Sequence, residues 1–110
     1  MGTRIIKRIN VKDFIHVLKS SNKISVNPHA LDRLSESQRA LFKSEQLLKI
    51  LIYENPRGIG LQTNGRYCLF YRRNFGFIKI ILEFKIDGIE IVIFMNVENM
   101  YNLERLKNEK

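Results

Sequence analysis

One segment, residues 77–86, constrains the fold of this chain most, because apolar and charged side chains alternate along it. The apolar side chains at even positions are Ile78, Ile80, Leu82, Phe84 and Ile86, and the charged ones at odd positions are Lys79, Glu83 and Lys85. Successive side chains of a strand point to opposite faces of a sheet, and an antiparallel sheet commonly has one solvated face. The pattern predicts a long strand with one face against a hydrophobic core.

Three turn signals around this strand predict an antiparallel meander. Asn64-Gly65 and Asp87-Gly88 are expected to form two-residue hairpin turns, since Asn, Asp and Gly tolerate positive φ. Asn74-Phe75-Gly76 is expected to form a three-residue loop that ends in glycine. Four strands are therefore predicted, at residues 57–62, 66–73, 77–86 and 89–95.

The loop lengths set the predicted pairing of these strands. They place Lys85 opposite Glu90, a favourable pair of charges, and Cys68 opposite Leu82, so that Cys68 and Phe70 face the core. The opposite face then shows Tyr67, Tyr71, Arg73, Lys79, Val92 and Phe94. Because that face is too apolar and aromatic for bare surface, we expect a ligand, a partner chain or the C-terminal residues to cover it.

The first half of the chain is predicted to be mainly helical. Asn10 can cap a helix at 11–19, whose apolar residues recur at helical spacing, and a short strand is expected at 23–26. Asn27-Pro28 is typical of a helix start, and helices are also predicted at 44–53 and, unless it is a frayed tail, at 97–106. The predicted fold class is α+β: N-terminal helices packed on a four-stranded antiparallel β-meander, with a short extra N-terminal strand and a C-terminal helix or tail.

Two segments hold most of the net charge of +8. Residues 1–26 contain six Lys or Arg against Asp13, which gives +5, and residues 57–73 contain four Arg and no acid, which gives +4. Two basic segments on a nearly neutral remainder favour a polyanionic partner, above all nucleic acid. The alternative is that the charge serves solubility alone.

Composition also excludes several classes of protein. The single cysteine, Cys68, rules out an internal disulfide, and two histidines without a C-x-x-C motif argue against a structural zinc site. No apolar core of a signal peptide and no uninterrupted apolar run is present, so we expect a cytoplasmic chain without a membrane segment. A single domain over 1–110 is expected, with its core at about 11–96, and no cofactor or metal is expected.

Two constellations are candidates for chemistry. His29 and Arg33 are spaced i, i+4 and would share a helix face near its first turn, where a phosphate can bind and the imidazole can move a proton. The alternative is that His29 is a spacer and Arg33 pairs with a neighbouring acid. On the sheet, Tyr67, Tyr71, Arg73 and Lys79 would combine stacking rings with positive charge, with Arg66 and Arg72 able to reach around the rim. Those rings could instead pack under the C-terminal residues.

The segment I-S-V-N-P-H-A-L-D-R-L at 24–34 and the strand Y-C-L-F-Y at 67–71 resemble the RelE/ParE-like superfamily of small toxins. The chain is most similar to uncharacterised relatives whose first core helix has an H-A-x-x-R motif, matched here by His29 and Arg33. Tyr67 and Tyr71 match the tyrosines of the strand motif, whereas Cys68 stands where that motif has an arginine. The resemblance implies a metal-independent endoribonuclease that cleaves RNA through its 2′-hydroxyl and is inhibited by an antitoxin protein.

Three functional hypotheses follow. In the first, a toxin-type ribonuclease, His29 is the general acid/base, Arg33 and Arg66 hold the phosphate, and Tyr71 stacks a base. RNA contacts are then expected from Tyr67, Tyr71, Arg72, Arg73 and Lys79. The second is a non-catalytic nucleic-acid-binding module. The third is a protein-interaction module whose aromatic sheet face takes up a helix or strand of a partner, or pairs with a second copy through Tyr71 and Phe94. An acidic antitoxin protein is a possible partner under the first and third hypotheses.

Overall fold

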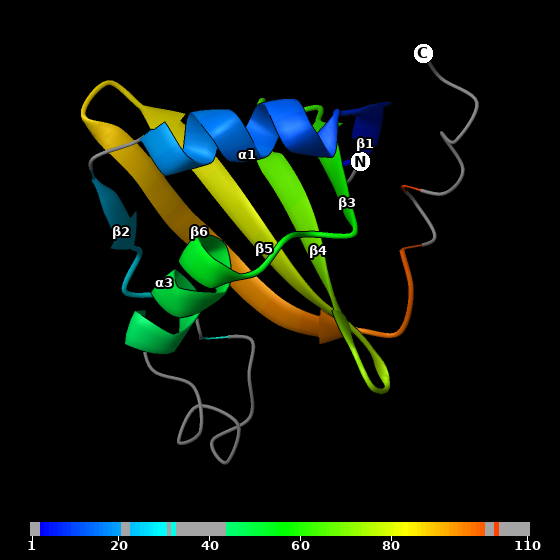
Figure 1. Cartoon of the computed structure of the whole chain (residues 1–110). Coiled ribbons are helices and arrows are strands. Elements are labelled where there is room, and N and C mark those ends of the chain that lie inside the picture. The colour runs from blue at the N-terminus through cyan, green and yellow to red at the C-terminus, as the bar shows by residue number, and fades with distance from the viewer. Residues whose placement is uncertain (1–2, 21–22, 31, 33–43, 101–102, 104–110) are drawn as a thin grey trace.

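A computed structural model describes residues 3–20, 23–30, 32, 44–100 and 103. These residues form a six-stranded sheet with two helices, α1 (Val11–Ser20) and α3 (Ser44–Tyr53), on the same face (Figure 1). Both helices begin where the sequence predicts. Asn10 caps α1, since its Oδ1 accepts a hydrogen bond of 3.0 Å from the backbone N–H of Asp13.

The sheet differs from the predicted four-stranded meander. Its strands are β1 (Ile5–Arg8), β2 (Ile24–Val26), β3 (Gly58–Gln62), β4 (Tyr67–Arg73), β5 (Gly76–Lys85) and β6 (Gly88–Val97). They are ordered β1-β3-β4-β5-β6-β2, and every neighbouring pair is antiparallel except β2 and β6, which are parallel. The predicted architecture is therefore wrong: the sheet is larger and mixed.

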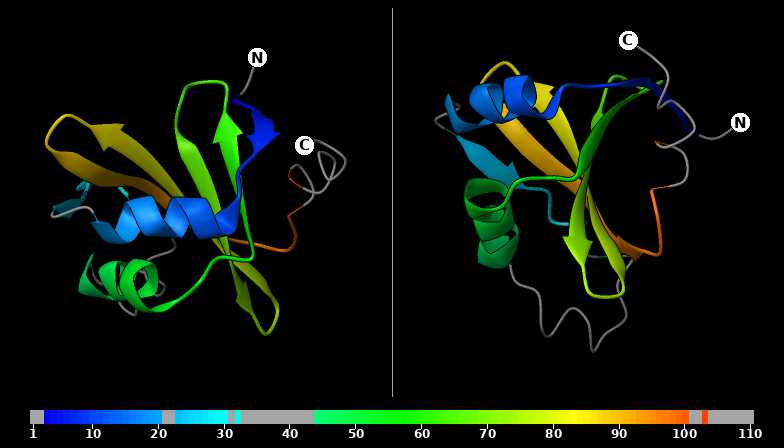
Figure 2. Two further views of the ribbon diagram at one scale, coloured as in Figure 1. Left: turned by 45° about the horizontal axis from the view of Figure 1, so that its top comes forward. Right: turned by 45° about the vertical axis from the view of Figure 1, so that its right-hand side comes forward.

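Two short strands at opposite edges of the sheet explain this error. α1 runs across the sheet between β1 on one edge and β2 on the other (Figures 1 and 2). β2 confirms the short strand expected at 23–26, but neither its three residues nor the four of β1 indicate in the sequence which strand they pair with. The parallel pair joins segments that lie far apart in the chain, here Ile24 and Ile89. Because no tight turn connects such strands, no turn motif in the sequence predicts the pairing.

All three hairpins have the same kind of turn, in which two residues are followed by a glycine with positive φ. The glycines are Gly65, Gly76 and Gly88, with φ of 85°, 109° and 151°, and no other described residue has positive φ. At Gly65, whose N–H donates to the carbonyl of Gln62, this is the pattern of a type I turn followed by a glycine bulge. The prediction that Asn64 would share the positive φ of a tighter turn is therefore wrong.

The turn before Gly76 shifts the register between β4 and β5 by one residue from the predicted one. Leu69 lies opposite Ile80, and Phe70 lies opposite Lys79. A slip of one residue exchanges the two faces of a strand. Tyr67, Leu69 and Tyr71 consequently point toward the helices, whereas Cys68 and Phe70 point to the other face, which reverses the prediction for β4.

A bulge at Val92 changes the facing of β6 in a similar way. The pairing with β5 shifts there, so that Ile91 lies opposite Leu82 while Ile93 lies opposite Ile81. Phe94 therefore faces the helices and is fully buried, although alternation from Val92 predicted it on the other face. The predicted contact of Lys85 with Glu90 does form, but diagonally, because Lys85 lies opposite Gly88.

The predicted helix start at Asn27-Pro28 is wrong in the residues that the structure describes. Residues 28–30 and 32 are in turns. The Asn27 side chain accepts a hydrogen bond from the N–H of His29, and the N–H of Ala30 bonds to the Asn27 carbonyl, which is a local turn pattern. The carbonyl of Ala30 accepts from the N–H of Phe94 on β6, so the sheet edge holds this segment out of a helix. Leu31, Arg33 and Leu34 lie outside the described residues.

We predict that Gly76→Ala destabilises the protein more than Gly65→Ala. Both glycines have positive φ, but a Cβ at Gly76 would collide with the carbonyl oxygen of Val97, whereas a Cβ at Gly65 meets open space. Gly65→Ala should lose only the conformational term of about 1 kcal/mol, and Gly76→Ala about 2–3 kcal/mol. Chemical denaturation measures both; equal losses would show that the carbonyl of Val97 moves aside freely.

Candidate functional site

The sheet face that points away from α1 and α3, called here the outer face, is partly covered by residues near the C-terminus. Met100 and Leu103 pack with the buried side chains Cys68, Phe70 and Ile81. Gly58 and Gly60 make room for them, since a Cβ at either glycine would meet the Leu103 side chain. The glycines of the G-x-G in β3 therefore leave space for the Leu103 side chain. The expectation that C-terminal residues cover this face is confirmed for Met100 and Leu103.

Cys68 is completely buried beneath this cover. Desolvation raises the pKa of its thiol to about 12, with a smaller opposing effect of the Lys79 ammonium group. A thiol with that pKa contains almost no thiolate at neutral pH, and the thiolate is the nucleophilic form. Cys68 therefore contributes packing to the outer face and no chemistry.

The uncovered part of the outer face contains two cations and a ring, which we call the cationic patch: Arg72, Phe77 and Lys79. The guanidinium carbon of Arg72, an exposed residue, lies 5.6 Å from the centroid of the Phe77 ring. Lys79 is half-buried between Phe70 on β4 and Met95 on β6, its neighbours in the sheet. Among the described residues, neither Arg72 nor Lys79 takes part in an ion pair.

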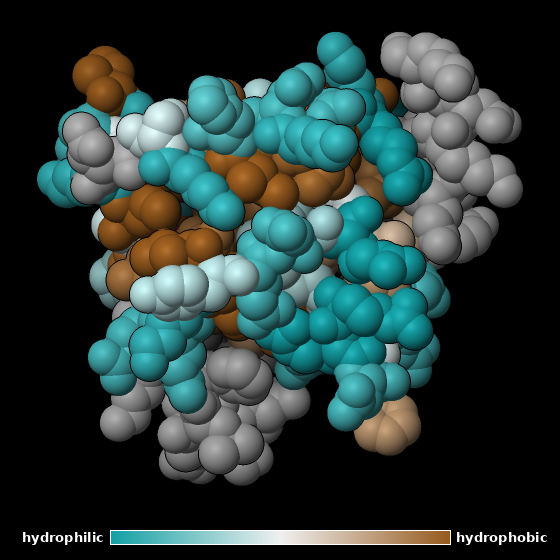
Figure 3. All heavy atoms as spheres, viewed as in Figure 1, coloured by the Kyte–Doolittle hydropathy of each residue, from teal (hydrophilic) through white to brown (hydrophobic). Residues whose placement is uncertain are grey.

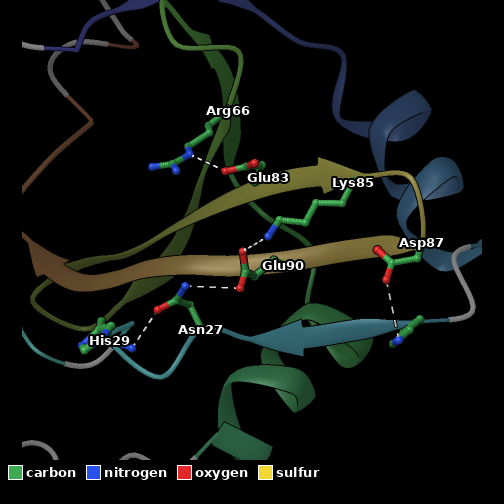
Figure 4. A network of polar contacts seen from close by, with 8 residues as sticks. Asn27, His29, Arg66, Glu83, Lys85, Asp87 and Glu90 are labelled. Carbon is green, nitrogen blue, oxygen red and sulfur yellow. Dashed lines mark hydrogen bonds and ion pairs between the residues drawn. The ribbon is translucent and has the colours of Figure 1, made fainter.

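The other end of the outer face has balanced charges (Figure 4). Nε of Arg66 lies 2.9 Å from Oε1 of Glu83, and Nζ of Lys85 lies 2.8 Å from Oε1 of Glu90. Glu90 also accepts a hydrogen bond from the Asn27 side chain, at 3.2 Å. The hydrogen bond between Lys85 and Glu90 raises the pKa of the lysine and lowers that of the carboxyl group. These cations are satisfied by their own acids.

His29 lies in the turn after β2 with an exposed side chain, and its Nδ1 is 2.8 Å from Oδ2 of Asp32. Figure 4 shows His29 on the far side of β6 from Arg66, whose side chain points to Glu83. Arg33, the third predicted catalytic residue, lies outside the described residues. The described part of the chain therefore does not bring His29 and Arg66 to one phosphate.

The two tyrosines predicted to stack bases lie on the helix side of the sheet. Tyr71 is fully buried, so its ring forms part of the core and no open surface. Tyr67 packs its ring against Phe14 and Phe84, with centroids 5.0 and 5.3 Å apart. The prediction that both rings lie on the face away from the helices is therefore wrong, and Tyr71 and Phe94, which are fully buried, present no surface to a second copy.

Arg73 also lies away from the cationic patch. Its two terminal nitrogens lie 2.8 and 2.9 Å from the two carboxylate oxygens of Glu54, the residue after α3. One of them also donates to the carbonyl of Arg72. This bidentate ion pair connects the end of β4 to the residue after α3, and so holds the helix and the strand in position relative to each other.

On the helix side, an apolar groove of about 550 Å³ lies between the two helices and β2. Hydrophobic side chains gather between α1 and α3 in Figure 3, whereas hydrophilic ones cover much of the surface to the right of α3. The groove is lined by Leu18, Lys19, Ile24, Leu48, Leu51, Ile52 and Tyr53. Among the described residues there is no group of three or more potential metal ligands, and no helix long and apolar enough to cross a bilayer.

No protein-family model, curated protein or solved structure matches this chain. The resemblance to RelE/ParE-like toxins therefore stays a prediction, as do the antitoxin partner and the homodimer. Of the predicted site residues, the structure brings together Arg72 and Lys79 and adds Phe77, which the sequence had assigned no role. The signal that could have found it is the i, i+2 spacing of Phe77 and Lys79, which puts them on the same face of a strand.

We predict that Tyr71→Phe leaves the free energy of unfolding unchanged or raises it. Within the described residues the Tyr71 hydroxyl is buried without a hydrogen-bond partner, and burial raises its pKa. Removing an unpaired buried hydroxyl should change stability by less than about 1 kcal/mol, whereas Tyr71→Ala should lose about 3–5 kcal/mol to a cavity. Urea denaturation measures the free energy of unfolding of both variants. A loss above about 2 kcal/mol for Tyr71→Phe, typical of a broken buried hydrogen bond, would contradict a hydroxyl without a partner.

We further predict that Leu103→Ala makes Cys68 react with a thiol reagent about tenfold faster, because local opening rather than global unfolding then limits access. Leu103 is fully buried and packs in the same cluster as Cys68. The matched control is Leu51→Ala, which truncates a leucine buried on the helix side of the sheet. Labelling should not accelerate in the control under native conditions. Equal rates in the two variants would mean that Leu103 does not cover the thiol.

Proposed function

We propose that this protein binds RNA through the cationic patch of its outer face, without cleaving it. The observation on which this rests is that Arg72 and Lys79 lie on one uncovered part of the sheet, beside Phe77, without an acid partner among the described residues. Two cations beside a ring are the elements that sheet surfaces use to bind phosphate and base together.

The distribution of acids supports a polyanion as the ligand. Four described cations, Lys23, Arg66, Arg73 and Lys85, have a carboxylate within 4.0 Å. The remaining positive charge includes the cationic patch, Lys7 on the edge strand β1 and Arg4 just before that strand, and both of these residues are exposed. Unpaired cations on one surface attract phosphates over a Debye length, whereas cations held by their own acids contribute little.

Binding is favoured over cleavage because the described residues do not assemble a general base with phosphate ligands. His29 is held by Asp32 in an exposed turn, and Arg66 is held by Glu83. The cationic patch, as defined by Arg72, Phe77 and Lys79, contains no histidine or carboxylate that could act as a general base for the 2′-hydroxyl. Arg72 and Lys79 can neutralise phosphates, which is sufficient for binding.

We predict that the double variant Arg72→Gln and Lys79→Gln weakens RNA binding and flattens its dependence on salt. Each phosphate contact in a single strand contributes about 0.7 to the slope of log affinity against log salt, so the slope should fall by about 1.4 between about 50 and 200 mM salt. Fluorescence anisotropy with a labelled RNA oligonucleotide measures affinity and slope in one titration series.

The control variant, Lys19→Gln and Lys49→Gln, removes the same charge from exposed positions of α1 and α3, on the other side of the sheet. It should keep the slope within about 0.3 of the native value, a change expected from the general field alone. Equal effects of the two double variants would reject the cationic patch as the binding surface. RNA fragments that form in EDTA and disappear in His29→Ala would instead establish the ribonuclease hypothesis.

A further inference from the structure

The tip of the β4–β5 hairpin presents an aromatic side chain to solvent. Phe75 is 97% exposed, although phenylalanine is among the residues most often fully buried in proteins. The hairpin projects beyond the body of the molecule in Figures 1 and 2. The three residues that precede Phe75 in the chain, Arg72, Arg73 and Asn74, line a shallow hollow of about 350 Å³. Phe75 therefore follows a polar and cationic segment, and it is not among the residues that line the apolar groove between the helices.

Two contacts anchor the backbone of this hairpin. Gly76 has a φ of 109° and packs so closely on Val97 that only glycine fits, which fixes the turn. Arg73 is bound through both terminal nitrogens to Glu54, which anchors the base of the hairpin to α3. A hairpin whose backbone is anchored in this way loses little backbone entropy when a ligand binds at its tip.

We infer that Phe75 is a stacking platform for an unpaired base, so that the ligand of this protein is single-stranded RNA rather than duplex. This rests on the proposed RNA binding and extends the cationic patch by one element. Phe75 directly precedes β5, Lys79 lies three residues beyond Gly76, about 10 Å at the rise of a strand, and Arg72 lies opposite Phe77 on the neighbouring strand. A strand whose phosphates contact Arg72 and Lys79 can place its next base on Phe75.

Duplex RNA fits this arrangement poorly. Its bases are paired and stacked on each other, and proteins recognise it mainly by shape and by contacts to the 2′-hydroxyl and phosphate groups. A free aromatic ring at a hairpin tip adds nothing to such contacts, whereas every unpaired base offers a π-face to it. The fully exposed ring thus discriminates between two forms of the same polyanion.

The test uses Phe75→Ala and Phe75→Tyr, with Ile86→Ala as the matched control. Ile86 is an equally exposed apolar residue at the tip of the neighbouring β5–β6 hairpin. Phe75→Ala should weaken binding of a labelled oligouridine about tenfold, the loss expected for one stacked base. Phe75→Tyr should retain affinity, Ile86→Ala should be neutral, and binding to a duplex of the same length should change little in all three.

A second readout reports stacking directly. The chain contains no tryptophan, so Phe75→Trp introduces a single indole whose fluorescence a stacked base quenches. Oligouridine should quench Phe75→Trp and leave Ile86→Trp unchanged. If the cationic patch variant loses RNA affinity while Phe75→Ala binds normally and Phe75→Trp is not quenched, the stacking inference fails and RNA binding stands. If the native chain binds no RNA, both fail. A blue shift of Phe75→Trp emission on anionic vesicles, without quenching by RNA, would also overturn the inference.

Discussion

The register between β4 and β5 is the constraint on which the rest of this structure depends. It is set by a two-residue turn followed by Gly76, whose positive φ and close contact with Val97 admit no other residue. With Leu69 opposite Ile80, the odd residues of β4 complete the core beneath the helices, and Arg72 and Lys79 emerge together on the outer face. A slip of one residue would exchange these two sets of side chains.

The two faces of the sheet differ in how completely they are covered. The helix side contains the larger hydrophobic cluster, including Tyr71 and Phe94, which the bulge at Val92 turns inward. The outer face has a second cluster that Met100 and Leu103 close over Gly58 and Gly60. Because this closure covers only part of the face, cations remain accessible at the hairpin end. Their lack of acid partners among the described residues, rather than the net charge, distinguishes that end from the balanced network at Glu83 and Glu90.

Much of the candidate site could not be predicted from the sequence, for physical reasons that the structure shows. The sequence identified Lys79 and Arg72 as candidate RNA contacts. The side chains beside them were predicted from a register between β4 and β5 that the turn residues alone do not determine. Asn64-Gly65 is compatible with more than one hairpin turn, and each choice gives a different facing of β4. The i, i+4 spacing of His29 and Arg33 suggested a helix, yet the Asn27 side chain and the edge of β6 hold His29 in a turn. Local hydrogen bonds of this kind leave no periodic signal.

The sequence by itself determined the elements whose signal is local: α1 and α3 through helical spacing, the long strand β5 through its alternation, and the three hairpins through their glycines. It also determined the positive charge and, with a single cysteine, the absence of an internal disulfide. Only the tertiary structure decided the six-stranded order, the parallel pairing of β2 with β6, the bulge at Val92, and the seat of Leu103 on the outer face. Each of these is a contact between segments distant in the chain, so its free energy depends on how whole surfaces fit together and is not encoded in any short pattern.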